Sequence, residues 1–297
     1  MFRGKKGKKI SSAVIALVLV VLAVIFKDEI KTDKTIKLED GNIGVYFVDV
    51  GQGHCTVIQS GNEGAIIDTG EREYSQTVLD FLNSHGIEKV RFMIATHPHS
   101  DHIGSMGTVI TKTKPEKIYM PYIADEYVPT NKTYFNFLTA IDENNVSAYF
   151  LKNKTETKLG DVKFTIIPPA KQIDDMNNMS LITKIEFGSV SFLIAGDAEK
   201  KEMTSVMSKN KGFDFSADFY LMAHHGSSTS TYEPFLNKVN FKAAVISCGK
   251  DNDYGHPHEE ALDYLEKYSI EYYRTDENGT VSVITDSEKC NITVEKG

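Results

Sequence analysis

Cysteine is scarce in this chain, and its scarcity excludes a fold held together by disulfides. Only Cys55, Cys248 and Cys290 occur among 297 residues, an odd number without close spacing, whereas disulfide scaffolds carry even, regularly spaced sets. The sequence also lacks an internal repeat, which excludes a solenoid. With 41% apolar residues, a chain of this length can bury one large core, and we predict a single catalytic unit.

Positive charge is also in short supply outside the N-terminus. Five of the 33 Lys and Arg residues lie between positions 3 and 9, which leaves 28 against 41 Asp and Glu, a formal charge near −13. A broad electrostatic surface for nucleic acid is therefore disfavoured. Bound divalent cations would still supply positive charge locally.

One segment, residues 10–26, is apolar and carries no charge. At a rise of 1.5 Å per residue, about 17 residues nearly cross the hydrocarbon core of a bilayer, so the segment is a signal anchor or a cleaved signal sequence. The absence of an A-x-A pattern and of a nearby cysteine favours the anchor. We predict a cytoplasmic basic tip and transmembrane anchor over 1–26, a linker over 27–42, and an extracellular domain over 43–297 of a single-pass cell-membrane protein.

Strand-like segments dominate both halves of the domain. We expect strands at 45–50, 56–58, 65–68, 92–96, 118–120, 148–151, 163–167, 181–187, 191–195, 220–223, 243–247 and 279–285, and helices at 75–84 and 259–268. Between 112 and 151 the pattern weakens, and a substrate-shaping insertion is expected there. Two strand-rich halves predict an α+β fold with two sheets packed face to face and helices outside.

The segment Thr96 to His102 packs three imidazoles and one carboxylate into its last six residues. It follows a predicted buried strand, so these groups would lie on a sharp turn at the strand's end. His97 and His99 can face one cation while Asp101 and His102 face a second, which is the ligand demand of a paired-metal hydrolytic site.

Further ligand candidates stand where other apolar runs stop. Asp197 follows one strand and could bridge two cations, and His224 and His225 follow another. Because neighbouring strand residues face opposite sides, only one of these two histidines would normally bind metal, unless the chain has already turned. Asp68 is expected to orient the metal turn by hydrogen bonds rather than to bind metal.

The loop 254–258 contains His256 and His258 before a predicted helix. One of them could contact a phosphate or protonate a leaving group. A role in capping the helix, or in the loop alone, is the competing interpretation.

These motifs resemble the metallo-β-lactamase superfamily and, within it, the extracellular hydrolase domain of ComEC-type competence proteins and their stand-alone relatives. The resemblance rests on His97-x-His99-x-Asp101-His102-Ile103-Gly104, Asp68, Asp49-Val50-Gly51-Gln52-Gly53, Asn178-x-Ser180-Leu181, Gly196-Asp197, His224-His225-Gly226-Ser227 and Gly255-His256-Pro257-His258. It covers about residues 43 to 285.

The resemblance implies an αββα four-layer sandwich, two Zn²⁺ ions, sometimes Mn²⁺, and hydrolysis of esters, often phosphodiesters. It assigns His97 and His99 to one metal, Asp101 and His102 to the other, and Asp197 to a bridge, with the 224/225 pair completing the set.

Two departures from the superfamily pattern stand out. No histidine lies between His102 and Asp197, and Asn178 or Ser180 occupies that region. His54 stands where the ComEC-like branch usually has aspartate.

We therefore predict an exported, membrane-anchored hydrolase in which a hydroxide shared by two metals attacks phosphorus or a carbonyl carbon. Asp101 and His256 are the candidate catalytic residues. A phosphodiester substrate is favoured, with nucleic acid as one form of it, although the acidic surface disfavours long duplexes. The alternative is another ester, such as a phosphocholine ester or a lactone. A non-catalytic metal-binding surface module is disfavoured by the number of ligands, and no oligomeric state follows from the sequence.

Overall fold

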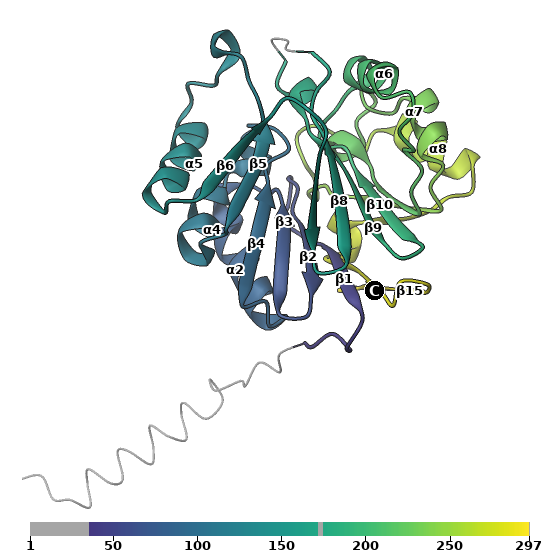
Figure 1. Ribbon diagram of the computed structural model, residues 1–297. Coiled ribbons are helices and arrows are strands. Elements are labelled where there is room, and N and C mark those ends of the chain that lie inside the picture. The colour runs from purple at the N-terminus through teal and green to yellow at the C-terminus, as the bar shows by residue number, and fades with distance from the viewer. Residues whose placement is uncertain (1–35, 172–174, 297) are drawn as a thin grey trace, which may run out of the picture. The chain divides into compact units, whose positions relative to one another are not determined.

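The computed structural model describes residues 36–171 and 175–296 (Figure 1). The predicted basic tip, the apolar segment 10–26 and most of the predicted linker lie outside these residues. Among the described residues, no helix has the length and apolar character needed to cross a membrane.

The first sheet has eight strands in the order β15-β14-β1-β2-β3-β4-β5-β6. Their bounds are β1 Ile43–Phe47, β2 Thr56–Ser60, β3 Glu63–Ile67, β4 Lys89–Ile94, β5 Lys117–Pro121, β6 Ser147–Leu151, β14 Val281–Thr285 and β15 Cys290–Val294. Strands β3 to β6 run parallel, and the others join by antiparallel pairing.

The second sheet has seven strands in the order β13-β12-β11-β10-β9-β8-β7. Their bounds are β7 Thr155–Leu159, β8 Val162–Ile167, β9 Ile182–Phe187, β10 Val190–Ile194, β11 Phe219–Leu221, β12 Ala243–Ile246 and β13 Glu271–Arg274. Strands β10 to β13 are parallel to one another, whereas β7 to β10 form antiparallel pairs.

Helices cover the outer face of each sheet (Figure 1). On the first sheet lie α2 Ser75–Ser84, α4 Met106–Thr113 and α5 Lys132–Glu143, and on the second lie α6 Lys200–Lys209, α7 Glu233–Val239 and α8 Glu259–Lys267. Short helices complete the fold: η1 Arg72–Tyr74, α3 Ser100–Ile103, η2 Asp125–Tyr127, η3 Asn177–Met179, η4 Ala223–Gly226 and α9 Thr275–Asn278. The predicted α+β sandwich with helices outside is confirmed.

Alternation along the strands explains why the layers form. In β10, Phe192 and Ile194 belong to the core between the sheets, while Leu193 belongs to the core beneath α6 and α7. In β4, Phe92 packs between the sheets and Met93 packs against the helices. Because successive strand side chains point to opposite faces, a strand that is apolar at every position is buried on both sides.

The prediction of a substrate-shaping insertion over 112–151 is not what the structure shows. This segment supplies β5, α5 and β6, and α5 buries Tyr134, Phe137 and Ile141 against the first sheet. The Asn131 side chain caps the helix by accepting a hydrogen bond from the Tyr134 amide. The segment therefore completes a structural layer.

The carboxyl ends of the parallel strands of both sheets meet at one edge of the sandwich. Leu181, which precedes β9, donates its amide hydrogen to the carbonyl of Thr96, which follows β4, at 2.9 Å. This bond ties the two sheets together where their strands end, and it places the loops after β4 and β10 side by side. Ligand sites in α/β sheets occur at such edges.

Candidate metal centre

The turn after β4 presents His97, His99, Asp101 and His102 at this edge. A neighbouring loop, the Gly-Gln-Gly segment that follows β1, holds it in place. The His54 amide donates to the Asp101 carbonyl at 3.0 Å, and a Cβ on Gly53 would lie 2.6 Å from that carbonyl oxygen. Only glycine permits so close an approach of the two backbones.

A first donor group joins the turn to the loop after β10. The Nε2 atom of His97 lies 3.1 Å from Nδ1 of His99 and 3.7 Å from Oδ2 of Asp197. His97 is fully buried and His99 is partly exposed. The group therefore has one side within the protein and one side toward solvent.

A second donor group contains Asp101, His102, Asp197 and His225. His102 Nε2 lies 3.1 Å from Asp197 Oδ1 and 3.7 Å from Asp101 Oδ2. His225 Nε2 lies 3.1 Å from Asp101 Oδ2 and 3.7 Å from Asp197 Oδ2. Asp197 is thus common to both groups, as its predicted bridging role requires.

The separations of these donor atoms suit a metal ion. Two ligands of a tetrahedral Zn²⁺ at about 2.1 Å from the metal are about 3.4 Å apart, and the separations in the two groups run from 3.1 to 3.7 Å. The buried Nε2 atom of His102 forms no hydrogen bond although carboxylates surround it. An unpaired buried nitrogen facing two carboxylates is the environment that a cation completes.

The tautomers of the buried histidines also suit a metal. His225 Nδ1 donates to the Ser247 carbonyl at 2.8 Å, and His102 Nδ1 donates to Asp68 at 2.7 Å. Each ring therefore has its Nδ1 proton held outside the donor group and turns Nε2 toward the group, which is the arrangement that metal-binding histidines adopt. The residues present fit a bound metal.

A third group, His54, Asp68 and His102, is different. Asp68 Oδ2 lies 2.7 Å from His102 Nδ1 and 2.9 Å from His54 Nδ1. These separations are too short to have a metal between the atoms and are those of charge-assisted hydrogen bonds. Thr96 adds two more bonds to Asp68, from its hydroxyl at 2.6 Å and its amide at 2.8 Å. Asp68 is placed to orient His102.

The histidines of the site differ in the direction in which their surroundings shift the pKa. Burial brings the pKa of His97 well below its usual value, so this ring is a neutral ligand. Burial also opposes charge on His102, but Asp197, Asp101 and Asp68 together raise its pKa well above the usual value. For Asp197 burial is outweighed by His102, His225 and His97, which bring its pKa well below normal. A cation would take the place of the protons that these carboxylates attract.

The chain has already turned at His224 and His225, so both rings reach the site. These residues have φ of 53° and 56°, the left-handed region that costs a side-chain-bearing residue roughly 1 kcal/mol or more. His225 lies in the second donor group. His224 Nε2 is 3.8 Å from Asp197 Oδ2, and its ring is held by Thr229 and Glu199. The alternation of strand residues does not apply here because β11 ends at Leu221.

His256 lies next to these two rings, at centroid distances of 5.4 Å from His224 and 5.8 Å from His225. Its Nδ1 accepts from Gln52 Nε2 at 3.4 Å, which leaves Nε2–H as a donor. Burial and the neighbouring histidines lower its pKa to about 4, so the ring is neutral near pH 7. His258 instead accepts from the Ser228 amide and lies near the Tyr254 carbonyl, which fixes the loop.

Asn178 and Ser180 support the site from outside the donor groups. Ser180 Oγ accepts from the Asp197 amide at 2.9 Å, and Asn178 Oδ1 accepts from the amides of Glu199 and Glu202 where α6 begins. Glu199 and Gln52 were not among the sequence-predicted residues. Gln52 stood in a quoted motif, but nothing in the sequence showed that it would contact His256.

The family of the chain follows from its match over residues 48–250 to the metallo-β-lactamase superfamily model. The chain belongs to this superfamily. ComE operon protein 3 from Bacillus subtilis is 31% identical over 258 residues, which cover 80% of this chain and 32% of that protein. Competence protein ComA from Neisseria gonorrhoeae is 27% identical over 236 residues, or 78% of this chain and 31% of that protein. The predicted resemblance to ComEC-type competence proteins is confirmed.

This chain spans about a third of the length of these curated relatives. Among solved structures, the metallo-β-lactamase fold protein YhfI from Bacillus subtilis matches with a TM-score of 0.53 at 13% identity, covering 81% of this chain and 99% of that one. At this identity the likeness concerns the fold.

Proposed function

We propose that this protein is a dinuclear metal-dependent hydrolase that acts on phosphodiesters. The observation that carries the proposal is the pair of donor groups that share Asp197. Asp101 is 25% exposed in its side chain and His224 is 19% exposed, so the buried donors are accessible from one side. A closed structural site would leave no such opening.

His97 and His99 would hold one cation, and Asp101, His102 and His225 the other, with Asp197 between them; Zn²⁺ is favoured by these ligands and Mn²⁺ is an alternative. When bound, the metals supply Lewis-acid activation of water and neutralise charge on the substrate. Asp68 and Ser247 hold the rings of His102 and His225 in place, and His256, whose Nδ1 accepts from Gln52, lies beside the rings of His224 and His225.

A hollow beside the donor groups supports an anionic substrate. It has a volume of about 610 Å³ and is lined by Lys200, Lys201 and Thr229, among others. Thr229 contacts His224, which connects the hollow to the centre. Asp175 and Glu199 line the hollow as well, and Lys200 Nζ lies 5.5 Å from the centre of the Tyr232 ring. Within residues 36–171 and 175–296, neither lysine forms an ion pair with a carboxylate, so each ammonium group could pair with a phosphate.

We also propose that residues 10–26 anchor the protein in the cell membrane with the hydrolase domain outside. The support is the uncharged apolar run after a basic tip. Membrane fractionation and protease accessibility of the full chain, against a chain that lacks residues 1–26, test this. Recovery of the full chain in the soluble fraction would contradict it.

A substrate panel tests the hydrolase proposal: bis-p-nitrophenyl phosphate, single-stranded DNA, p-nitrophenyl phosphocholine and a lactone, each with Zn²⁺ and with Mn²⁺. We expect turnover of the small diester. Turnover of DNA as well would assign a nuclease. Turnover of only the lactone would replace the phosphodiesterase by another esterase, and no turnover with metal bound would overturn the proposal.

A further inference from the structure

His54 is a buried histidine that belongs to neither donor group. Its exposed fraction is 2%, and it is joined at both ring nitrogens: Nδ1 lies 2.9 Å from Asp68 Oδ2, and Nε2 lies 2.9 Å from Thr56 Oγ1. Its backbone is used as well, since its amide donates to Asp101 and its carbonyl accepts from Gly70. A ring fixed at both ends within 3 Å of the carboxylate that holds His102 has more than a packing role.

We infer that His54 is a positioning residue for the metal centre and that it acts through Asp68. Because the Asp68 carboxylate accepts, the proton of the neutral His54 ring resides on Nδ1, and Nε2 accepts from the Thr56 hydroxyl. Asp68 Oδ2 also accepts from His102 Nδ1 at 2.7 Å. Asp68 Oδ2 therefore accepts from two imidazoles at once, which restrains rotation of the carboxylate away from His102.

The consequence lies at the other nitrogen of His102. As long as Asp68 accepts from Nδ1, Nε2 stays directed toward Asp101 and Asp197, where a metal would bind it. Without the donor from His54, the buried Asp68 carboxylate loses one of its four hydrogen bonds. It can then rotate, which changes its hydrogen bonds to Thr96 and His102. Partners that orient a metal-binding histidine typically change metal affinity by about 10- to 100-fold when they are removed.

Two amide substitutions test the roles of the two ring nitrogens of His54 separately. His54→Asn places an amide N–H near the position of Nδ1 and keeps the donor to Asp68. His54→Gln places its amide near Nε2, toward Thr56, and leaves Asp68 without that donor. The variants are otherwise matched in polarity and lack of charge.

The measurement is Zn²⁺ affinity of the metal-free protein by competition with a chromophoric chelator, with urea unfolding of the same samples before zinc is added. We expect His54→Asn to lie within about threefold of wild type and His54→Gln to fall by about 10- to 100-fold. A purely structural role would lower the urea midpoint of both variants without this split. Equal affinities in the two variants would overturn the inference.

Two controls protect this comparison. His85→Ala removes a half-buried histidine that contacts the Phe81 carbonyl at 2.9 Å and lines a hollow that contains none of the donor residues, and it should leave Zn²⁺ affinity unchanged. If His54→Gln does not fold, His54→Met, which also lacks a donor to Asp68, replaces it and should show the same loss. Thr56→Val keeps the donor to Asp68, and a tenfold loss of affinity in this variant would contradict the inference. The inference rests on the proposed metal centre, and failure of wild type to bind zinc would instead remove the proposed function itself.

Discussion

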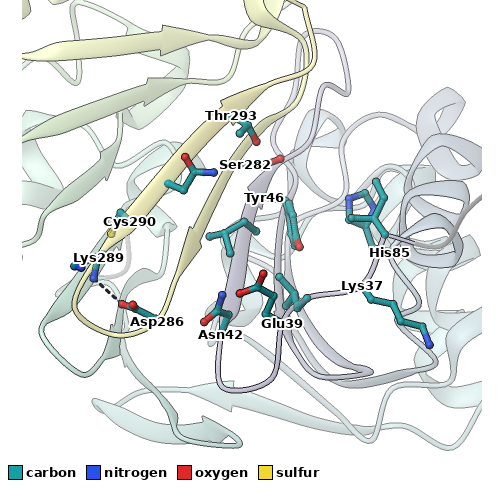
Figure 2. Close-up of a pocket in the computed structure, with 14 residues that line it drawn as sticks. Lys37, Glu39, Asn42, Tyr46, His85, Ser282, Asp286, Lys289, Cys290 and Thr293 are labelled. Atoms are coloured by element: carbon teal, nitrogen blue, oxygen red, sulfur yellow. Dashed lines mark hydrogen bonds between the residues drawn. The ribbon is translucent and has the colours of Figure 1, made fainter.

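The two ends of the sandwich carry similar residue types and differ in how those residues are arranged. At the carboxyl ends of the parallel strands, imidazoles and carboxylates converge to within 3.1 to 3.8 Å of one another. At the other end, a hollow of about 490 Å³ lies beneath the start of β1 and the β14–β15 turn (Figure 2). It contains Lys37, Glu39, His85, Asp286 and Lys289.

Two of the ionisable groups in this second hollow have local backbone partners. Asp286 accepts from the amides of Glu288 and Lys289 in its own turn, and His85 contacts the carbonyl of Phe81 one helical turn away. None of the five ionisable side chains named above has a buried nitrogen or oxygen without a hydrogen bond. The comparison shows that the volume of a hollow says little about chemistry, whereas convergence of buried donor atoms from distant segments says much.

The largest expected effect is at the residue common to both donor groups. Asp197→Asn keeps the shape of the side chain and removes its charge, so we expect hydrolysis to fall at least 10³-fold, or about 4 kcal/mol in the barrier. Metal content by elemental analysis should fall with it, while circular dichroism stays unchanged. Asp286→Asn is the matched control at the other end and should leave activity as in wild type. If the Asp197→Asn variant kept both metal and activity, the two ends of the sandwich would not differ in metal binding as we propose.

A smaller effect is expected at a buried carboxylate outside the donor groups. Glu202, on α6, is 2% exposed and accepts from the Ala170 amide at 2.7 Å. Burial raises its pKa to about 7, against the opposing effects of that amide, Lys209 and Lys171. The folded state therefore holds the proton in a range where the unfolded chain has released it, and the free energy of unfolding falls as pH rises from about 4.5 to about 7.

Glu202→Gln keeps an acceptor for Ala170 and removes this titration. The metal-free variant should match wild type near pH 4.5 and exceed it by up to about 3 kcal/mol above pH 7. Urea unfolding at several pH values measures the difference. Zinc affinity should not change, which would sharpen the contrast between ionisable groups that bind metal and those that only affect stability. A difference that is constant with pH would show that Glu202 titrates normally.

The sequence predicted the layers and most of the strands because apolar runs and alternation are local signals. Helix α5 was missed because its buried Tyr134 and Phe137 lie in a segment rich in Tyr, Asn and charge, and its burial depends on the sheet beside it. The donor residues could be found from their density and from the strands that precede them. The approach of both His224 and His225 to Asp197 could not be predicted, because it follows from left-handed backbone geometry after β11.

His54 shows the same limit within a recognised motif. Its position after Gly53 marked it as unusual, but the sequence contains no sign that its ring would lie between Thr56 and Asp68. Contacts of this kind join β2, β3 and the turn after β4, and they exist only once the first sheet is formed. Tertiary hydrogen bonds to a metal ligand are therefore the part of the site that required the structure.

The smallest effect concerns the lysines of the two hollows. Lys200→Met with Lys201→Met removes two positive charges beside the donor groups, and Lys37→Met with Lys289→Met removes two from the opposite end. Both double variants change the net charge equally, so any long-range effect on an anionic substrate is common to them. Exposed charges contribute only about 1 kcal/mol to binding. We therefore expect KM for a phosphodiester to rise about fivefold in the Lys200→Met, Lys201→Met variant and to stay unchanged in the other. We expect kcat to stay nearly constant, because these lysines would contact the substrate and the transition state alike. The rise should diminish at high salt. Equal changes in both variants would mean that net charge, rather than the hollow beside His224, attracts the substrate.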